Sequence, residues 1–176
     1  MLSSLAFVGM LLQISFGLVM PAYSFLKFDF SEAFCLIGGF VCGPVWGLAV
    51  AFIKALLHLS LDGDWIGHSI NFIAVGSMTL VASLFWQWGK NNQKHRWTII
   101  TIGLLSAIIA RVIIIIPTNW VFITNTFYST FFPTKELLTV YLTTVVPTFN
   151  SIQGLVTSIV FIPLFAISQT LIKKEE

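Results

Sequence analysis

The sequence predicts an all-α integral membrane protein with six transmembrane helices, forming a single domain over residues 1–176. Hydrophobic residues make up 57% of the chain and charged residues 9%, whereas soluble domains average about 45–50% and about 25%. The charges are clustered, so that residues 1–26, 33–53, 65–89 and 137–172 carry none. Apolar stretches near twenty residues match a hydrocarbon layer about 30 Å thick. This pattern places the chain in a lipid bilayer and argues against a soluble enzyme, a secreted protein or a nucleic-acid-binding protein.

Prolines, glycines and short polar stretches separate the predicted spans. Pro21 ends the first span, and Gly43-Pro44 separates the second from the third, because proline cannot continue a helix and disfavours a helical residue before it. Asp62-Gly63-Asp64 is typical of a turn. The six spans are predicted over residues 2–20, 30–42, 45–61, 66–88, 97–123 and 148–172.

Two features are expected in the second half of the chain. Pro117 and Asn119 are expected to interrupt the outer half of the fifth span, because proline removes a helical hydrogen bond. The long connection over residues 124–147 is expected to hold a short helix near residues 135–146 before the last span begins.

The positive charges indicate how the spans are oriented. With six spans, both termini and the connection between the fourth and fifth spans share one side of the membrane. That side carries a group of basic residues: Lys90, Lys94, Arg96, Lys173 and Lys174. The opposite side carries Lys27 and Lys135 together with five acidic residues. Positive residues concentrate in cytoplasmic loops, so we expect both termini to be cytoplasmic and the long connection to face outward.

Two cations fall within the predicted spans, where an arginine costs about 2.5–3.5 kcal/mol on insertion scales. Arg111 lies midway along the fifth span, and no carboxylate is expected deep within any span. Its partners are therefore expected to be carbonyls, amides, water or an anionic ligand, which leaves a substrate contact and a structural role both open. Lys54 is expected to extend toward the lipid headgroups in a structural role.

Amide side chains form a second group of candidates. Asn71, Asn119, Asn150 and Gln153 all fall in the outer halves of their predicted spans. Several amides converging below a long aromatic connection indicate a small-molecule pocket that opens to the outside. The alternative is ordinary hydrogen bonding between helices, worth about 0.6 kcal/mol on average.

Signatures of catalysis are absent from the sequence. The three histidines, His58, His68 and His95, have no HExxH spacing, and no cysteine pairs with them to suggest zinc. There is no Walker A sequence either. We therefore expect no catalytic residues, no metal and no cofactor, and an energy source outside the chain. A membrane-embedded enzyme acting on a lipid-soluble substrate remains the more distant alternative.

Short motifs along the chain match one known family in the correct order. The first half carries Asp29-Phe30-Ser31-Glu32, Gly43-Pro44-x-x-Gly47, and Lys54 followed by Leu56-Leu57-His58. The second half carries Ile70-Asn71-Phe72, Asn119 and Phe149-Asn150-x-x-x-Gly154. Over nearly its whole length the chain resembles the substrate-binding S components of energy-coupling factor (ECF) transporters, which are bacterial vitamin importers. It is most similar to the riboflavin-specific members.

The resemblance implies a vitamin-binding subunit in the bacterial cell membrane, for which the vitamin is a substrate. It also implies three partner subunits, a transmembrane T component and two ATPases. Family members dock through small residues on the first span, and here the corresponding residues are expected to be Ser3, Ala6 and Gly9.

The resemblance further implies which residues contact the vitamin. Riboflavin-specific members carry an asparagine on the sixth span, usually followed three residues later by a lysine; Asn150 matches, and Gln153 replaces the lysine. Asn119 matches a further flavin-contacting asparagine. Arg111 stands where an apolar residue is typical, and a guanidinium pairs well with a carboxylate. Riboflavin is therefore expected first, with pantothenate or another anionic vitamin as the alternative. The expected binding residues are Asn71, Arg111, Asn119, Asn150 and Gln153.

Overall fold

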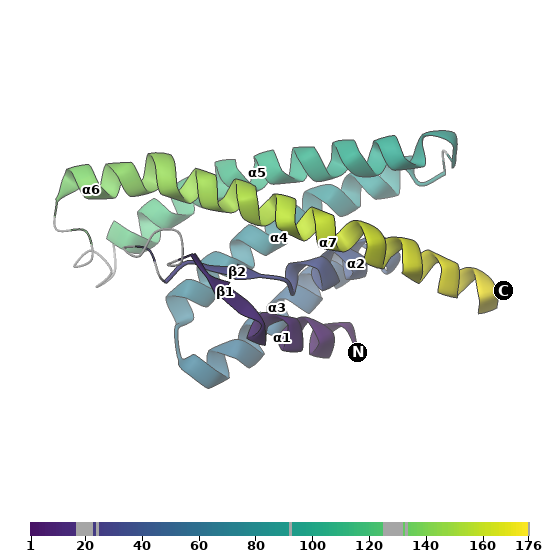
Figure 1. The fold of residues 1–176 in the computed structure, drawn as a ribbon, viewed down its shortest axis with the longest axis horizontal. Coiled ribbons are helices and arrows are strands. Elements are labelled where there is room, and N and C mark those ends of the chain that lie inside the picture. Colours follow the sequence, from purple (N-terminus) through teal and green to yellow (C-terminus); the bar gives the residue numbers. More distant parts are fainter. Residues whose placement is uncertain (17–22, 24, 92, 125–131, 133, 176) are drawn as a thin grey trace.

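The computed structural model describes residues 1–16, 23, 25–91, 93–124, 132 and 134–175, which are mainly helical (Figure 1). The α-helices are α1 (Leu2–Leu11), α2 (Glu32–Val41), α3 (Pro44–Asp62), α4 (Trp65–Gly89), α5 (Arg96–Thr124), α6 (Lys135–Val140) and α7 (Val146–Glu175). A 3₁₀ turn, η3 (Gln93–His95), precedes α5, and a π-helix, η5 (Tyr141–Val145), joins α6 to α7. Two short strands, β1 (Gln13–Ser15) and β2 (Lys27–Asp29), pair in antiparallel register.

Within the described residues, four helical segments are long and apolar enough to cross a membrane. They are α3, α4, α5 and the continuous run of α6, η5 and α7, with mean hydropathies of 1.6, 1.6, 2.8 and 1.8. The helices α1 and α2 are apolar but have only 10 residues each, about 15 Å at 1.5 Å per residue. The predicted class, a helical membrane protein, is confirmed, whereas the count of six spans stays a prediction.

The first predicted span, residues 2–20, is wrong in its second half. Helix α1 ends at Leu11, and the chain then forms β1, in which Gln13 lies opposite Asp29 of β2. The backbone groups of this segment are therefore paired with a strand that comes later in the sequence. The remainder of the predicted span, residues 17–20, lies outside the described residues.

The predicted breaks around α3 are confirmed. Gly43 adopts a φ of 111°, which favours glycine, and Pro44 then begins the helix. Gly63 ends α3 with a φ of 73°, and the Asp64 side chain accepts a hydrogen bond from the backbone N–H of Gly67 at the start of α4. The chain therefore turns sharply between α3 and α4.

The interruption expected at Pro117 is wrong, because α5 continues through it to Thr124. In this turn the side chains of Thr118 and Asn119 donate to the carbonyls of Ile114 and Ile115. The short helix expected near residues 135–146 is present as α6 and η5, but it continues directly into α7 and is not separated from the last span. The π-helical turn, in which Val146 N–H donates to the Tyr141 carbonyl, precedes Pro147, which has no N–H to donate.

Helix α2 lies in the middle of the bundle, in contact with α1, α3, α4 and α7. Figure 1 shows α5 and the α6–α7 run extending along the molecule on one side, with α1 and the strand pair on the other. Phe40 of α2 stacks on Trp86 of α4 with ring centroids 5.6 Å apart, and the Trp86 indole N–H donates to the Phe40 carbonyl. The apolar core packs along α2 from Ala33 to Phe40 and therefore holds this helix inside the protein.

Helix α1 packs its small residues against the same core. Ala6 is fully buried, and a Cβ added to Gly9 would lie 3.2 Å from Ser31 Cα. Ser3 is half-buried. Ala6 and Gly9 therefore serve contacts within the chain, and docking of a partner through Ser3, Ala6 and Gly9 stays a prediction. The exposed side of α1 carries Leu5 and Val8 instead.

Candidate ligand-binding site

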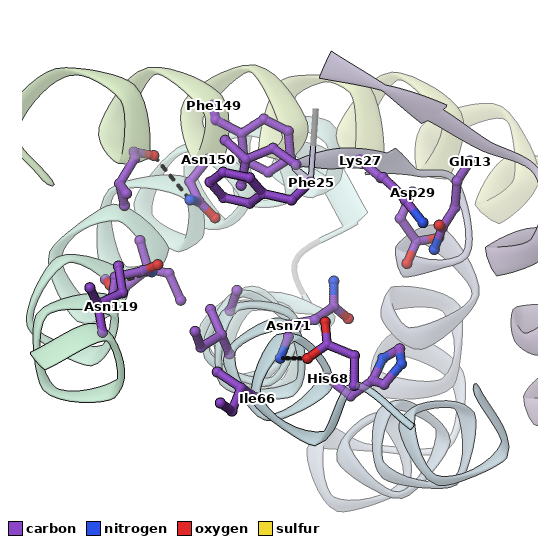
Figure 2. A pocket seen from close by; sticks show the side chains of 18 of the residues that line it. Gln13, Phe25, Lys27, Asp29, Ile66, His68, Asn71, Asn119, Phe149 and Asn150 are labelled. Carbon is purple, nitrogen blue, oxygen red and sulfur yellow. Dashed lines mark hydrogen bonds between the residues drawn. The ribbon is translucent and has the colours of Figure 1, made fainter. Parts of the chain in front are cut away.

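A cavity of about 180 Å³ is bounded by α3, α4, α5, α7 and the strand β2. Much of its wall is aromatic or aliphatic, including Phe25, Ile70, Tyr141 and Phe149. Amides from three different helices also line it: Asn71 of α4, Asn119 of α5 and Asn150 of α7. Figure 2 shows these three amides around one open space, with the aromatic rings of Phe25 and Phe149 beside Asn150. An apolar wall with a few convergent polar groups is typical of a small-molecule site.

Two of these amides are held in place by neighbouring groups. Asn119 donates to the Ile115 carbonyl at 3.0 Å and accepts from the Tyr141 hydroxyl at 3.3 Å. Asn150 donates to the Val146 carbonyl at 3.0 Å and accepts from Arg111 Nε at 2.9 Å. An amide NH₂ has two donors and its oxygen has two lone pairs. Each amide therefore keeps bonding capacity for a ligand while its orientation is set by the protein.

Asn71 differs from the other two amides. Its Oδ1 atom is buried and makes no hydrogen bond within the described part of the chain. Leaving a buried acceptor without a partner costs about 1–3 kcal/mol. Since this oxygen belongs to a residue of the cavity wall, a ligand donor would remove that cost.

Gln153, the fifth expected binding residue, lies outside the cavity lining. Its Nε2 donates to the Asp29 carbonyl at 2.6 Å, and its Oε1 accepts from the Asp29 N–H at 3.2 Å. The side chain is only 1% exposed. Gln153 thus fixes the end of β2 to α7, a role that the sequence analysis did not assign to it.

Arg111 has a carboxylate partner, contrary to the sequence-based expectation. Its Nη1 and Nη2 atoms lie 2.5 Å and 3.0 Å from the two carboxylate oxygens of Glu32, the first residue of α2. Both side chains are 2% exposed. The Thr157 hydroxyl of α7 also donates to Glu32. A bidentate pair of this kind compensates the arginine charge, so the geometry favours the structural role that was left open for Arg111.

Lys54 is likewise paired inside the protein and does not extend toward headgroups. Its Nζ lies 2.6 Å from Asp29 Oδ2 and 2.6 Å from the Ser31 hydroxyl, with no exposed side-chain surface. The pKa of Asp29, which lies in β2 outside the candidate spans, is lowered. Burial, the largest single effect, would raise this pKa, but the Lys54 ammonium and hydrogen bonds from Lys54 and Ser31 outweigh it.

Asp29 and Glu32 are therefore interior residues, which was not predicted from the sequence. A signal was available in the sequence, because two cations within apolar spans require negative partners. Asp29 lies just before the second predicted span, and Glu32 lies near its start. The network joins residues 29–32 to α3 through Lys54, to α5 through Arg111 and to α7 through Gln153 and Thr157. One wall of the cavity is thus fixed to three helices.

A third polar cluster lies where α3 meets α4. The Asp62 carboxylate contacts two imidazoles, with Oδ1 2.7 Å from His68 Nε2 and Oδ2 3.4 Å from His58 Nδ1. All three residues belong to the cavity wall. No metal was expected at the histidines from their spacing in the sequence.

Comparisons with known proteins agree with the family expected from the motifs. The family model described as "ECF transporter, substrate-specific component" matches residues 1–165. The riboflavin transporter RibU of Staphylococcus aureus is 33% identical over 169 residues, covering 94% of this chain and 85% of that protein. The riboflavin transporter FmnP of Bacillus subtilis is 33% identical over 174 residues, covering 94% of this chain and 86% of that protein.

A solved structure supports the same assignment at the level of the fold. It is described as the S component of a bacterial ECF transporter, and it superposes with a TM-score of 0.76 at 31% identity. The match covers 98% of this chain and 93% of the solved chain. Sequence and fold therefore agree over almost the full length, and the chain belongs to the family of substrate-specific components of ECF transporters.

Proposed function

We propose that this protein binds riboflavin in the cavity lined by Asn71, Asn119 and Asn150 and captures it for import. The observation that carries the proposal is the convergence of these amides, from three helices, on a cavity with an aromatic wall. A flavin has a planar ring with donors and acceptors along one edge, which suits amides beside aromatic side chains. The relatives named as riboflavin transporters, at about 30% identity over most of the chain, support this choice of vitamin.

The charge of the site favours a neutral vitamin over pantothenate. The case for an anionic vitamin depended on an unpaired Arg111, and in the structure this guanidinium is paired with Glu32 on both terminal nitrogens. An anion bound to Arg111 would have to compete with a carboxylate that is already buried beside it. Arg111 also belongs to the cavity wall, and in this proposal it orients Asn150 through Nε and does not bind an anion.

The remaining parts of the proposal concern the membrane and the partners. The whole chain forms one unit in the bacterial cell membrane, with six membrane segments, both termini in the cytoplasm and the cavity open to the outside. The vitamin is cargo and not a cofactor. Delivery across the membrane requires a transmembrane T component and two ATPase subunits, which supply the energy.

The direct test is a titration of riboflavin and, separately, pantothenate into the purified chain. We expect stoichiometric quenching of flavin fluorescence without any partner, and no heat of binding with pantothenate. Binding of pantothenate with no response to riboflavin would overturn the choice of vitamin but not the family.

A second experiment addresses transport. Vesicles that contain the chain together with the T component and the ATPases should accumulate riboflavin only when ATP is present. Accumulation by the chain alone, driven by an ion gradient without ATP, would contradict the proposed division of labour.

A further inference from the structure

The turn between α3 and α4 brings two histidines and one carboxylate together. His58 and Asp62 are four residues apart on α3 and lie on one face of its last turn, while His68 lies in the first turn of α4. The sharp reversal at Gly63, with a φ of 73°, places these two turns side by side. The imidazole rings of His58 and His68 have centroids 5.0 Å apart. Each of the three residues offers one candidate ligand atom, and these three atoms all lie within 4.8 Å of one another.

The two imidazoles are buried, and their bonding is incomplete. Each histidine is 8% exposed, whereas the Asp62 side chain is 40% exposed. Asp62 Oδ1 accepts a hydrogen bond from His68 Nε2 at 2.7 Å, but His58 Nδ1 is buried and makes no hydrogen bond within the described part of the chain. This nitrogen faces Asp62 Oδ2 at 3.4 Å without making a hydrogen bond, and a buried ring nitrogen with no hydrogen bond is costly. It is also available as an electron-pair donor when the ring is neutral.

The donor set and its spacing are those of a transition-metal site. Imidazole nitrogen and carboxylate oxygen bind Zn²⁺ at about 2.0–2.2 Å, and three protein ligands leave a fourth position for water or another ligand. Tetrahedral ligand atoms at that distance are about 3.4 Å from one another. Small side-chain rotations of residues already within 4.8 Å would therefore complete the site. Two neutral imidazoles and one carboxylate also place a negative charge beside the cation.

We propose that His58, Asp62 and His68 bind one divalent transition-metal ion of the Zn²⁺ type at the junction of α3 and α4. The three residues belong to the wall of the cavity, and Figure 2 shows His68 on α4 close to Asn71. An ion bound there would join the end of α3 to the start of α4 and close this part of the cavity wall. The proposal does not depend on which vitamin the cavity holds.

The first test measures metal binding by the full chain, purified with a histidine-free affinity tag and treated with a chelator. Titration with Zn²⁺ in a calorimeter should give one ion per chain, and Zn²⁺ should raise the unfolding temperature. Co²⁺ should produce the intense visible absorption of a tetrahedral site, which needs no variant to interpret. Failure of the chain to bind Zn²⁺ stoichiometrically, or a weak octahedral Co²⁺ spectrum, would overturn the proposal.

The second test compares variants of the cluster with a matched control. His58→Ala and His68→Ala should each weaken Zn²⁺ binding by at least about 10-fold, while His95→Ala should not, because His95 is exposed in η3 at the α4–α5 connection. Asp62→Asn keeps an oxygen that can accept a hydrogen bond from His68 but removes the negative charge, so it should also weaken Zn²⁺ binding.

Retention of wild-type Zn²⁺ affinity by Asp62→Asn and both alanine variants would show that the cluster only stabilises the turn between α3 and α4 through hydrogen bonds. Circular dichroism and the unfolding temperature without metal identify any variant that does not fold. If a variant does not fold, the Co²⁺ spectrum of the unmodified chain still tests whether the metal site exists.

Discussion

At the scale of single residues, the interior of this protein depends on two compensated charges. Arg111 pairs with Glu32 and Lys54 pairs with Asp29, and each of the four side chains is 2% exposed or less. Replacing a buried ion pair by apolar groups is often tolerated, but removing one partner leaves an uncompensated charge. The two kinds of change should therefore have different consequences for stability.

Arg111→Met should lower the free energy of unfolding by about 3–5 kcal/mol, because it leaves the Glu32 carboxylate buried without its cation. The double variant Arg111→Met with Glu32→Gln should recover part of this loss. Thermal unfolding of the purified chain in detergent measures both, with Lys94→Met as the control at an exposed cation. Equal stability of the single variant, the double variant and the unmodified chain would show that the pair is not stabilising.

Asn71→Leu should affect binding and stability in opposite directions. The substitution removes a buried oxygen that makes no hydrogen bond within the described residues, so the chain without ligand should be as stable as before or more so. Riboflavin should bind about 5- to 100-fold more weakly, because its donor would lose an acceptor worth about 1–3 kcal/mol.

The measurements for Asn71→Leu are a fluorescence titration and a thermal unfolding curve. Asn119→Leu provides the comparison, because it breaks the bond with Tyr141 and should therefore weaken both binding and stability. Unchanged riboflavin affinity in the Asn71 variant would remove this residue from the proposed site.

At the scale of helices and strands, prediction succeeded where the signal is local. The ends of α3, α4 and α5 lie within one residue of the predicted spans, since Gly43-Pro44, Asp62-Gly63-Asp64 and the polar stretch after α4 act on adjacent residues. The end of α1 was not predictable in this way, because β1 requires β2 as its partner, and the paired residues lie 12 to 16 positions apart in the sequence, from Ser15 with Lys27 to Gln13 with Asp29. Pro117 was overestimated as a break, because α5 continues past it and neighbouring side chains bond to the carbonyls of that turn.

Close approach of helices is a second property at this scale. A Cβ on Gly47 of α3 would lie 2.8 Å from Gly39 Cα of α2 and 2.6 Å from the Thr79 side chain of α4. Gly47→Ala should therefore destabilise the protein by about 1–3 kcal/mol, because backbone cannot move aside as a side chain can.

The matched control is Gly76→Ala on α4. A Cβ there would meet only the flexible end of Leu48, at 3.2 Å, so its unfolding temperature should stay close to that of the unmodified chain. Comparison of the two unfolding temperatures in detergent tests the argument. A larger loss in the Gly76 variant than in the Gly47 variant would contradict it.

At the scale of the whole molecule, the cavity results from contacts that no short stretch of sequence contains. The amides Asn71, Asn119 and Asn150 were expected to converge, because all three fall toward the same ends of their helices, and the structure places them on one cavity. The roles of Gln153 and Glu32 were not expected, because they depend on how β2 and α2 fold between α3, α5 and α7. The convergence of these three amides was therefore predictable from the sequence, whereas the scaffold that positions them was not.

The orientation of the molecule in the membrane is the property that the distribution of charge predicts and that labelling can test. Figure 1 shows the α4–α5 connection and the C-terminus toward one end of the molecule, and the α3–α4 turn and α6 toward the other. If basic residues such as Lys90 and Lys94 mark the cytoplasmic side, then the exposed residue Glu136 at the start of α6 faces the outside. In a background without Cys35 and Cys42, a membrane-impermeant maleimide should label Glu136→Cys in intact cells. It should label Lys94→Cys, also at an exposed position, only after the membrane is permeabilised. The reverse pattern would place the cavity opening on the cytoplasmic side, and a chain oriented in that way could not capture a vitamin from outside the cell.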